Sequence, residues 1–257
     1  LNSDPRISTS TNLFEVNVGL VSGENDFFVM NQATVEEFNL QQSVIPIISR
    51  SEQLKGVQLT NEDYNNLIEL GKKVFFFAPG NVRFDALTDE QKAYIQCRIR
   101  PRWYHVSQTW CADAFLIRQA HLYPRMILNE KKALVTDTLH KVRFLEGIDG
   151  KQVTAAFLNT YTFALSETLG RSYGGGVLTF EPGEIRKIRI PMHMADQLDL
   201  QKIDTWQRQG EIDKVLEYTD SILLRKGLSL TEHEIKLLHS IWKKMCDRRM
   251  SRKNQKK

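Results

Sequence analysis

The sequence has little cysteine and no long apolar run, and both absences limit the classes of protein to which it can belong. Its three cysteines, Cys97, Cys111 and Cys246, form no C-x-x-C pair and have no histidine at metal-ligand spacing. A disulfide framework and a zinc site are therefore not indicated. There is no N-terminal apolar segment and no apolar run of about 18 residues, which argues against secretion and membrane spanning. We expect a cytoplasmic protein that binds no metal and no membrane.

Motifs of the common enzyme classes are also missing. The chain has no G-x-S-x-G, H-E-x-x-H or G-x-x-x-x-G-K-[ST] motif, and its six histidines do not fall into a ligand pattern. Glu181, Glu184 and Lys187 are similar to the acidic end of a nuclease motif, but no preceding Pro-Asp pair completes it. We therefore expect a turn after a strand at this place.

The basic residues are concentrated in two stretches. The chain carries 35 Lys and Arg against 31 Asp and Glu, a formal net charge of +4. From Ile241 onward eight cations face one acid, so this tail carries +7 and the remaining residues carry about −3. Between Arg83 and Arg143 eleven cations face six acids. The internal stretch is a candidate electrostatic footprint for nucleic acid, whereas the tail is typical of a solvated C-terminus that can also contact phosphates.

Alternating and continuous apolar runs predict a sheet-rich N-terminal part. Residues Phe14 to Leu20 alternate between apolar and polar, which predicts a strand. After a polar turn at 22–26, we expect Phe27 to Met30 to return as the second strand of a hairpin. Short turns separate three further apolar runs that we expect to form a sheet: Ala114–Ile117, Met126–Leu128 and Ala133–Phe144.

Helix caps supply the next signals. Thr60 is expected to cap a helix that ends at Gly71, after which 73–77 is expected to be a buried strand. Thr88 with Gln91 forms the pattern of a capping box, which predicts a short helix that leads to Arg98.

Beyond Pro191 the apolar residues keep helical spacing, and Thr231 with Glu234 forms another capping-box pattern. The fold class that we predict is α/β (α+β), a sheet-rich domain with an amphipathic helix followed by a small helical C-terminal region. The expected division places the first domain at 1–194, the helical region at 195–250 and a disordered basic tail at 251–257.

The stretch from Phe157 to Pro191 is the most informative part of the sequence. Apolar spacings of three and four predict a single amphipathic helix over 152–169, with Gly170 in the left-handed conformation after it. The glycines at 174–176 allow the backbone to approach another surface, and a strand ending at Ile190-Pro191 is expected to follow. Two interpretations stay open. The glycines form a packing turn, or they approach a phosphate backbone beside the donors Arg171, Ser172 and Tyr173.

Two clusters combine cations with aromatic residues. The first interleaves arginine forks, which suit guanine edges and phosphates, with rings that can stack on bases: Arg98, Arg100, Arg102, Trp103, Tyr104 and His105. The alternative is that its rings cap the core and its arginines form a solvated face. The second cluster contains Arg125, Asn129, Lys131 and Lys132 after a Tyr-Pro turn, and its alternative is an ordinary hairpin surface.

The order of these segments resembles a known family. Residues 19–28 are similar to the G-x-x-T-G-x-N-x-F-F opening of the target recognition domain of TaqI-like N6-adenine DNA methyltransferases, with Ser22 in the usual threonine position. Arg102-Trp103-Tyr104, the 124–129 segment and the 157–191 stretch resemble later blocks. The resemblance covers Val18 to Pro191.

The resemblance implies DNA recognition without catalysis in this chain. The family's catalytic domain binds S-adenosylmethionine and carries a [DNS]-P-P-[YF] motif, and this chain has neither that motif nor an F-x-G-x-G cofactor loop. We therefore expect no cofactor here and no methylation by the chain alone. The implied partners are double-stranded DNA and the catalytic domain of a parent restriction-modification enzyme, in which the target adenine is flipped out of the duplex. A first residue of Leu1 suggests a fragment of that parent.

Sequence-specific DNA recognition is thus the leading prediction. The candidate contact residues are Arg98, Arg100, Arg102, Trp103, Tyr104, His105, Arg125, Asn129, Lys131, Arg171, Ser172 and Tyr173. One alternative is an interaction module whose C-terminal helices dock a methyltransferase or nuclease partner. The other is a self-contained nuclease, against which the incomplete acidic motif argues.

Overall fold

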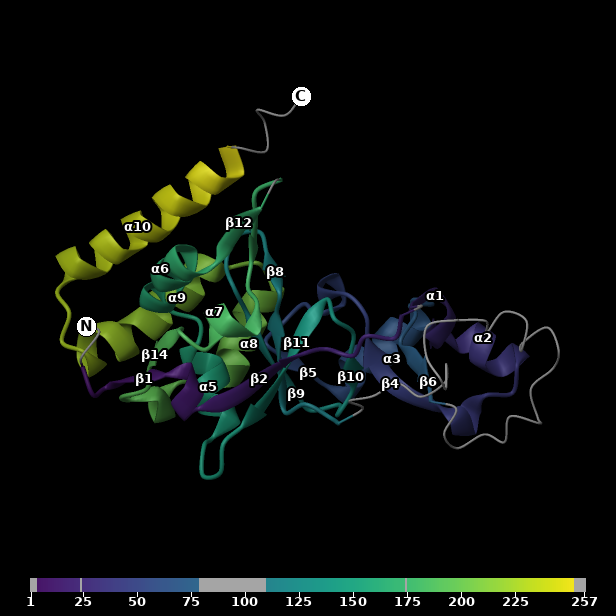
Figure 1. Cartoon of the computed structure of the whole chain (residues 1–257). Coiled ribbons are helices and arrows are strands. Elements are labelled where there is room, and N and C mark those ends of the chain that lie inside the picture. The colour runs from purple at the N-terminus through teal and green to yellow at the C-terminus, as the bar shows by residue number, and fades with distance from the viewer. Residues whose placement is uncertain (1–3, 24, 79–109, 174, 252–257) are drawn as a thin grey trace.

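The computed structural model describes residues 4–23, 25–78, 110–173 and 175–251, and these form the mixed α/β (α+β) structure that we predict. A five-stranded sheet occupies the middle of the molecule, with a group of helices at one end and a four-stranded sheet at the other (Figure 1). No helix in the described ranges is both long and apolar enough to cross a lipid bilayer.

The five-stranded sheet separates two cores. Its strands are β2 (Phe14–Val18), β5 (Gln58–Leu59), β7 (Ala114–Ile117), β9 (Met126–Asn129) and β11 (Leu139–Phe144). Their order is β2-β11-β7-β9-β5, with antiparallel neighbours except for the parallel β9–β5 pair. Alternate residues of a strand point to opposite faces, so Ala114 and Leu116 join one core whereas Phe115 and Ile117 join the other. The strand expected from Phe14 and the runs at 114–117 and 126–128 are confirmed.

The apolar run from Ala133 to Phe144 is divided between two sheets. Its first part is β10 (Leu134–Val135), which pairs in parallel with β4 (Val44–Ile48), and its second part is β11. Between them the hydroxyl of Thr136 donates a hydrogen bond to the carbonyl of Ser49 at 2.9 Å. The run is strand-forming as expected, and it supplies the edge of one sheet and the interior of another.

The expected N-terminal hairpin does not form. Its second strand is replaced by α1 (Asn25–Phe28) and β3 (Val29–Met30), and β3 pairs with β6 (Phe75–Phe77) rather than with β2. The rings of Phe28 and Phe76 stack with centroids 5.7 Å apart. The apolar residues at 27–30 are consecutive, so their spacing shows neither the helical nor the strand period. Packing against distant residues then decides between helix and strand.

The four-stranded sheet has the order β10-β4-β6-β3 and lies beside α2 (Gln32–Glu37) and α3 (Asn61–Glu69) (Figure 1). Thr60 caps α3 as predicted: its hydroxyl accepts from the amide of Asp63 at 3.1 Å, and the Asp63 carboxylate accepts from the amide of Thr60 at 2.9 Å. The chain leaves this helix at Gly71 with φ of 66°. The buried strand after it is confirmed as β6, whereas the helix expected at Thr88 lies outside the described residues.

Two helices take the place of the single one expected over 152–169. They are α5 (Gly150–Ala156) and α6 (Thr160–Leu169), and Asn159 between them is fully buried. The Asn159 side chain accepts from the amide of Thr162 at 2.9 Å, so it starts a new helix inside the core. Because side chains are buried all round from 153 to 164, the expectation of one apolar stripe was wrong.

The strand expected to end at Pro191 is likewise two short strands in different sheets. α7 (Pro182–Ile185) separates β13 (Val177–Thr179) from β14 (Arg189–Pro191). β13 lies between β12 and β8 in a three-stranded sheet, and β14 pairs with β1. Those partners are β1 (Ile7–Thr9), β8 (Gln119–Ala120) and β12 (Arg171–Tyr173).

The C-terminal region is helical, as predicted. It contains α8 (Leu200–Arg208), α9 (Ile212–Asp220), the π-helical turn η7 (Ser221–Gly227) and α10 (Glu232–Ser251). The capping box at the start of α10 is confirmed, because Glu234 accepts from the amide of Thr231 at 2.8 Å. α10 packs along α6, and the rings of Trp242 and Phe163 lie 5.1 Å apart.

The division of the chain at 194/195 stays a prediction. Short 3-10 turns occur at Ser10–Asn12, Gln41–Ser43, Ser51–Gln53 and Ala195–Gln197.

Candidate nucleic-acid interface

Half of the candidate contact residues lie outside the described residues, and their roles stay predictions. These are Arg98, Arg100, Arg102, Trp103, Tyr104 and His105. The segment that contains them connects β6 of the four-stranded sheet to β7 of the central sheet. The other six candidates divide between β12 and the neighbourhood of β9, which belong to different sheets.

Strand β12 presents three candidates on the surface. Arg171, Ser172 and Tyr173 are all exposed, and Tyr173 keeps 55% of its surface. Arg171 donates to Glu184 at 2.9 Å with 54% of its side chain exposed, and this hydrogen bond raises the pKa of its guanidinium further above the ordinary value. The Tyr173 side chain also forms a hydrogen bond with Arg171. A phosphate would therefore have to compete with Glu184 and Tyr173 for Arg171, while the exposed part of the Tyr173 ring is accessible for stacking.

Glycines shape both ends of this hairpin, and each for a different reason. Gly170 is extended, with φ of −70°, so the left-handed conformation expected there was wrong. A Cβ at Gly170 would lie 2.7 Å from the Leu178 side chain, so close packing is what requires glycine. Gly175 and Gly176 have φ of 84° and 74° and form the turn into β13.

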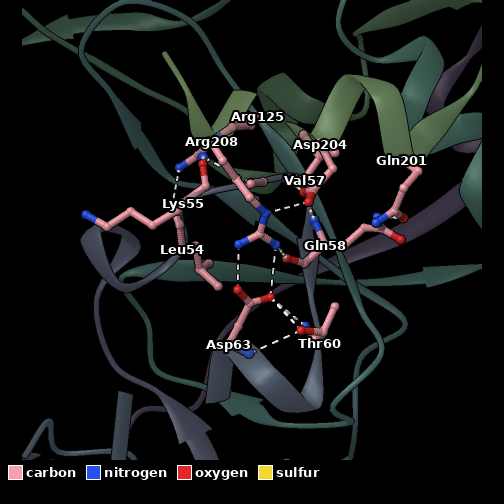
Figure 2. Close-up of polar contacts among 11 residues, drawn as sticks. Leu54, Lys55, Val57, Gln58, Thr60, Asp63, Arg125, Gln201, Asp204 and Arg208 are labelled. Carbon is pink, nitrogen blue, oxygen red and sulfur yellow. Dashed lines mark hydrogen bonds and ion pairs between the residues drawn. The ribbon is translucent and has the colours of Figure 1, made fainter. Parts of the chain in front are cut away.

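Arg125 lies in a backbone cradle (Figure 2). Its guanidinium donates to the carbonyls of Lys55 at 2.7 Å, Gly56 at 3.0 Å and Leu54 at 2.8 Å. Burial lowers the pKa of the guanidinium, which still remains a cation at any physiological pH. These bonds bind the 54–56 loop to the turn before β9, so the described structure gives Arg125 a role in the fold.

Asp204 and Arg208 of α8 bond to the residues that follow this loop and to Asp63 of α3 (Figure 2). Asp204 Oδ1 accepts from the amides of Val57 at 2.6 Å and Gln58 at 3.1 Å. Arg208 bridges Asp204 and Asp63, with Nε–Oδ2 and Nη1–Oδ1 distances of 2.5 Å. We name Asp63, Asp204 and Arg208 the α8 joint. Sequence reasoning missed it, although the Asp204–Arg208 spacing of four on a helix was a usable signal.

Asn129 ends β9 and Lys131 follows it, and both make contacts within the fold. Asn129 is 1% exposed, and its amide donates to the carbonyls of Ala112 at 2.8 Å and Ala133 at 2.9 Å. Lys131 Nζ donates to Asn61 Oδ1 at 3.1 Å and lies over the Tyr64 ring, 4.7 Å from its centroid. Asn129 has almost no surface to offer a ligand, whereas Lys131 is half-buried.

Two further cations gather at Trp110, the first described residue after 79–109. Lys141 Nζ lies 4.3 Å and the Arg143 guanidinium 4.4 Å from the centroid of the Trp110 ring. Burial, with the nearby Arg143 charge, lowers the pKa of Lys141 to about 8. Both cations were counted in the basic stretch but were not selected. Their alternation on one strand could have shown that they share a face.

The acidic residues that are similar to a nuclease motif are engaged with arginines. Glu181 accepts from Arg118 at 2.7 Å, and Glu184 accepts from Arg171 at 2.9 Å. Glu184 also accepts from the Glu181 amide at 2.9 Å, which caps α7. Among the described residues, no group of three His, Cys, Asp or Glu side chains is placed to hold a metal ion. Where a turn after a strand was expected, the local structure after β13 is the short helix α7.

The described structure is a mixed α/β fold with an exposed β12–β13 hairpin, and sequence comparison identifies its class. Residues 1–224 match the family described as "Type II methyltransferase M.Eco57I, C-terminal domain". The match spans most of the chain. The protein belongs to this family.

Two relatives extend the comparison. The Type II methyltransferase M.AccI of Acinetobacter calcoaceticus is 25% identical over 227 residues, which cover 81% of this chain and 40% of M.AccI. The crystal structure of the type IIG restriction endonuclease BpuSI superposes with a TM-score of 0.54 at 12% identity, covering 96% of this chain and 32% of that protein. The chain thus spans well under half of either relative, and BpuSI shares the fold.

Proposed function

We propose that this chain recognises sequence in double-stranded DNA as the specificity part of an adenine-specific (N6) methyltransferase of a restriction-modification system. The observation that carries the proposal is the family match over residues 1–224. M.AccI is by name a methyltransferase and BpuSI a restriction endonuclease. Methyl transfer from S-adenosylmethionine belongs to a separate catalytic domain, since this sequence contains no [DNS]-P-P-[YF] motif.

The described surface supports DNA contact mainly at β12. Arg171 and Ser172 supply donors for backbone phosphates, and the exposed Tyr173 ring is available for stacking or for packing on a sugar. Arg98, Arg100, Arg102, Trp103, Tyr104 and His105 are retained as base-reading candidates. Arg125 and Asn129 make bonds within the fold, and the proposal does not depend on them.

Selection of duplexes from a random pool tests sequence recognition directly. We expect one motif to be enriched and its affinity to fall steeply with added salt, because Lys and Arg contacts release counterions from DNA. Arg100→Ala/Arg102→Ala should weaken binding to that motif by about 1 to 3 kcal/mol per lost base contact.

The matched control removes two cations elsewhere. Lys214 and Lys236 lie in exposed surface pairs with Glu211 and Glu232, so Lys214→Gln/Lys236→Gln loses the same charge with little structural cost. Fluorescence anisotropy with the enriched duplex should show wild-type affinity for this control. Salt-insensitive binding, or a pool that yields no motif, would contradict the proposed function.

A further inference from the structure

A buried arginine anchors the last turns of α10. Arg249 and Glu167 of α6 each expose 3% of their side chains and pair at 2.6 Å. Arg249 Nη1 also donates to the carbonyls of His121, at 2.7 Å, and Gly176. A buried charge is tolerated when it is paired and its donors are satisfied, so this arrangement defines where the helix ends.

The same anchor sets α10 against the β12–β13 turn. A Cβ at Gly176 would lie 2.9 Å from Met250 Sδ, which shows how closely the glycine turn approaches the helix. Figure 1 shows the C-terminal end of α10 beside the hairpin that carries β12. Of the two interpretations of the glycines at 174–176, Gly176 therefore fits the packing turn. Its consequence is that the end of α10 packs directly on the hairpin that carries the exposed β12 residues.

The exposed charged residues of this helix end are Lys244, Asp247 and Arg248, so cations outnumber acids there. Lys244 and Arg248 are exposed and four residues apart, which places them on one face of α10. Among the described residues, neither has a carboxylate within ion-pair distance. Two other cations of this part of α10 are engaged within the fold. Glu167 neutralises Arg249, and Lys243 lies over the Trp242 ring. Lys244 and Arg248 are therefore the cations of these turns that a ligand can reach.

We propose that the end of α10 and the β12–β13 hairpin form one binding surface for the phosphate backbone of double-stranded DNA, to which the helix contributes the cations Lys244 and Arg248 and the hairpin contributes Arg171. The inference rests on the proposed function and extends it to a helix outside the family match, which ends at residue 224. We commit to DNA because Lys244 and Arg248 complement phosphate charge and lie on the helix end that contacts the hairpin assigned to DNA by the proposed function. Such contacts hold the duplex without reading its bases.

The test compares Lys244→Gln/Arg248→Gln with Lys214→Gln/Lys236→Gln in the whole 257-residue chain. Anisotropy with a short mixed-sequence duplex, measured over a range of salt concentrations, gives affinity and salt dependence. We expect the Lys244/Arg248 variant to bind about tenfold more weakly and its log–log salt slope to be smaller by about 2, because two phosphate contacts are lost. The control pair should keep both values.

The outcomes separate this inference from the proposed function. If the wild-type chain binds no duplex at any salt concentration, the proposed function fails. If it binds but the Lys244/Arg248 variant matches the control in affinity and slope, this inference alone is overturned. Lys244→Arg/Arg248→Lys keeps both charges and should bind as the wild type does. Weak binding by this variant would also overturn the inference, because it would show that positive charge at these two positions is not what binds the duplex.

Discussion

Single buried polar residues hold this molecule together by bonding backbone groups that are distant along the chain. Arg125 reaches carbonyls about 70 residues away, and Asp204 accepts from amides more than 140 residues away. Asp220 at the end of α9 caps α6 in the same manner, accepting from the amide of Thr160 at 2.9 Å and from its hydroxyl at 2.6 Å. Buried polar groups need such partners, so each of these residues specifies one packing arrangement.

Asp220 also makes stability depend on pH. Burial raises the pKa of its carboxyl from 3.8 to about 6, although the hydrogen bonds from Thr160 act in the opposite direction. The folded protein therefore holds the proton more tightly than the unfolded chain, and the free energy of unfolding falls as pH rises from about 4 to about 6. Asp220→Asn does not ionise, so its stability relative to wild type should rise over this window by up to about 3 kcal/mol.

Urea unfolding of both proteins below and above this window measures the effect. Asp196→Asn is the control, because Asp196 is exposed. The prediction fails if the difference between Asp220→Asn and wild type is the same at the two pH values.

At the scale of a single element, the start of helix α6 depends on one residue, Asn159. Asn159 caps it through Thr162 and donates to the carbonyl of Ala156 at 2.6 Å, all inside the core. Asn159→Ala should lower the free energy of unfolding by about 2 to 3 kcal/mol, because a cap is lost and a buried carbonyl loses its donor. The matched variant is Asn31→Ala, which removes the cap of α2 in a less buried place and should cost about 1 kcal/mol. Equal losses in chemical denaturation would show that burial adds nothing to the cap.

At the scale of the whole molecule, the α8 joint connects the C-terminal helices to the loop and helix that lead into the four-stranded sheet. Arg208 is 31% exposed on its side chain, and its partner Asp204 only 5%. Arg208→Met removes the guanidinium that pairs with the Asp204 carboxylate. We expect the free energy of unfolding to fall by about 2 kcal/mol, which is less than for a fully buried ion pair because solvent screens this one. Amide hydrogen exchange should increase in 54–69. The control Lys214→Met breaks a surface ion pair and should leave the free energy of unfolding and the hydrogen exchange nearly unchanged. If Arg208→Met also leaves both unchanged, the proposed role of the α8 joint is refuted.

The sequence alone determined the features whose partners lie within a few residues. Thr60 and Thr231 find their capping partners three positions away, and alternation along 14–18 identifies a strand with one buried face. The helical C-terminal region followed from local patterns in the same way, whereas the methyltransferase family was indicated by the resemblance of several blocks in order along the chain.

Tertiary structure alone decided the features that depend on distant contacts. The Phe28 ring stacks on Phe76, 48 positions along the chain, and the start of α6 is held by Asp220, which accepts from the amide and the hydroxyl of Thr160. Arg125 was selected as a DNA contact from its charge, but the carbonyls of 54–56 occupy its guanidinium. The closeness of α10 to β12 likewise depends on Arg249 meeting Glu167 and Gly176. Burial and long-range hydrogen bonding are properties of the assembled chain, so no local pattern contains them.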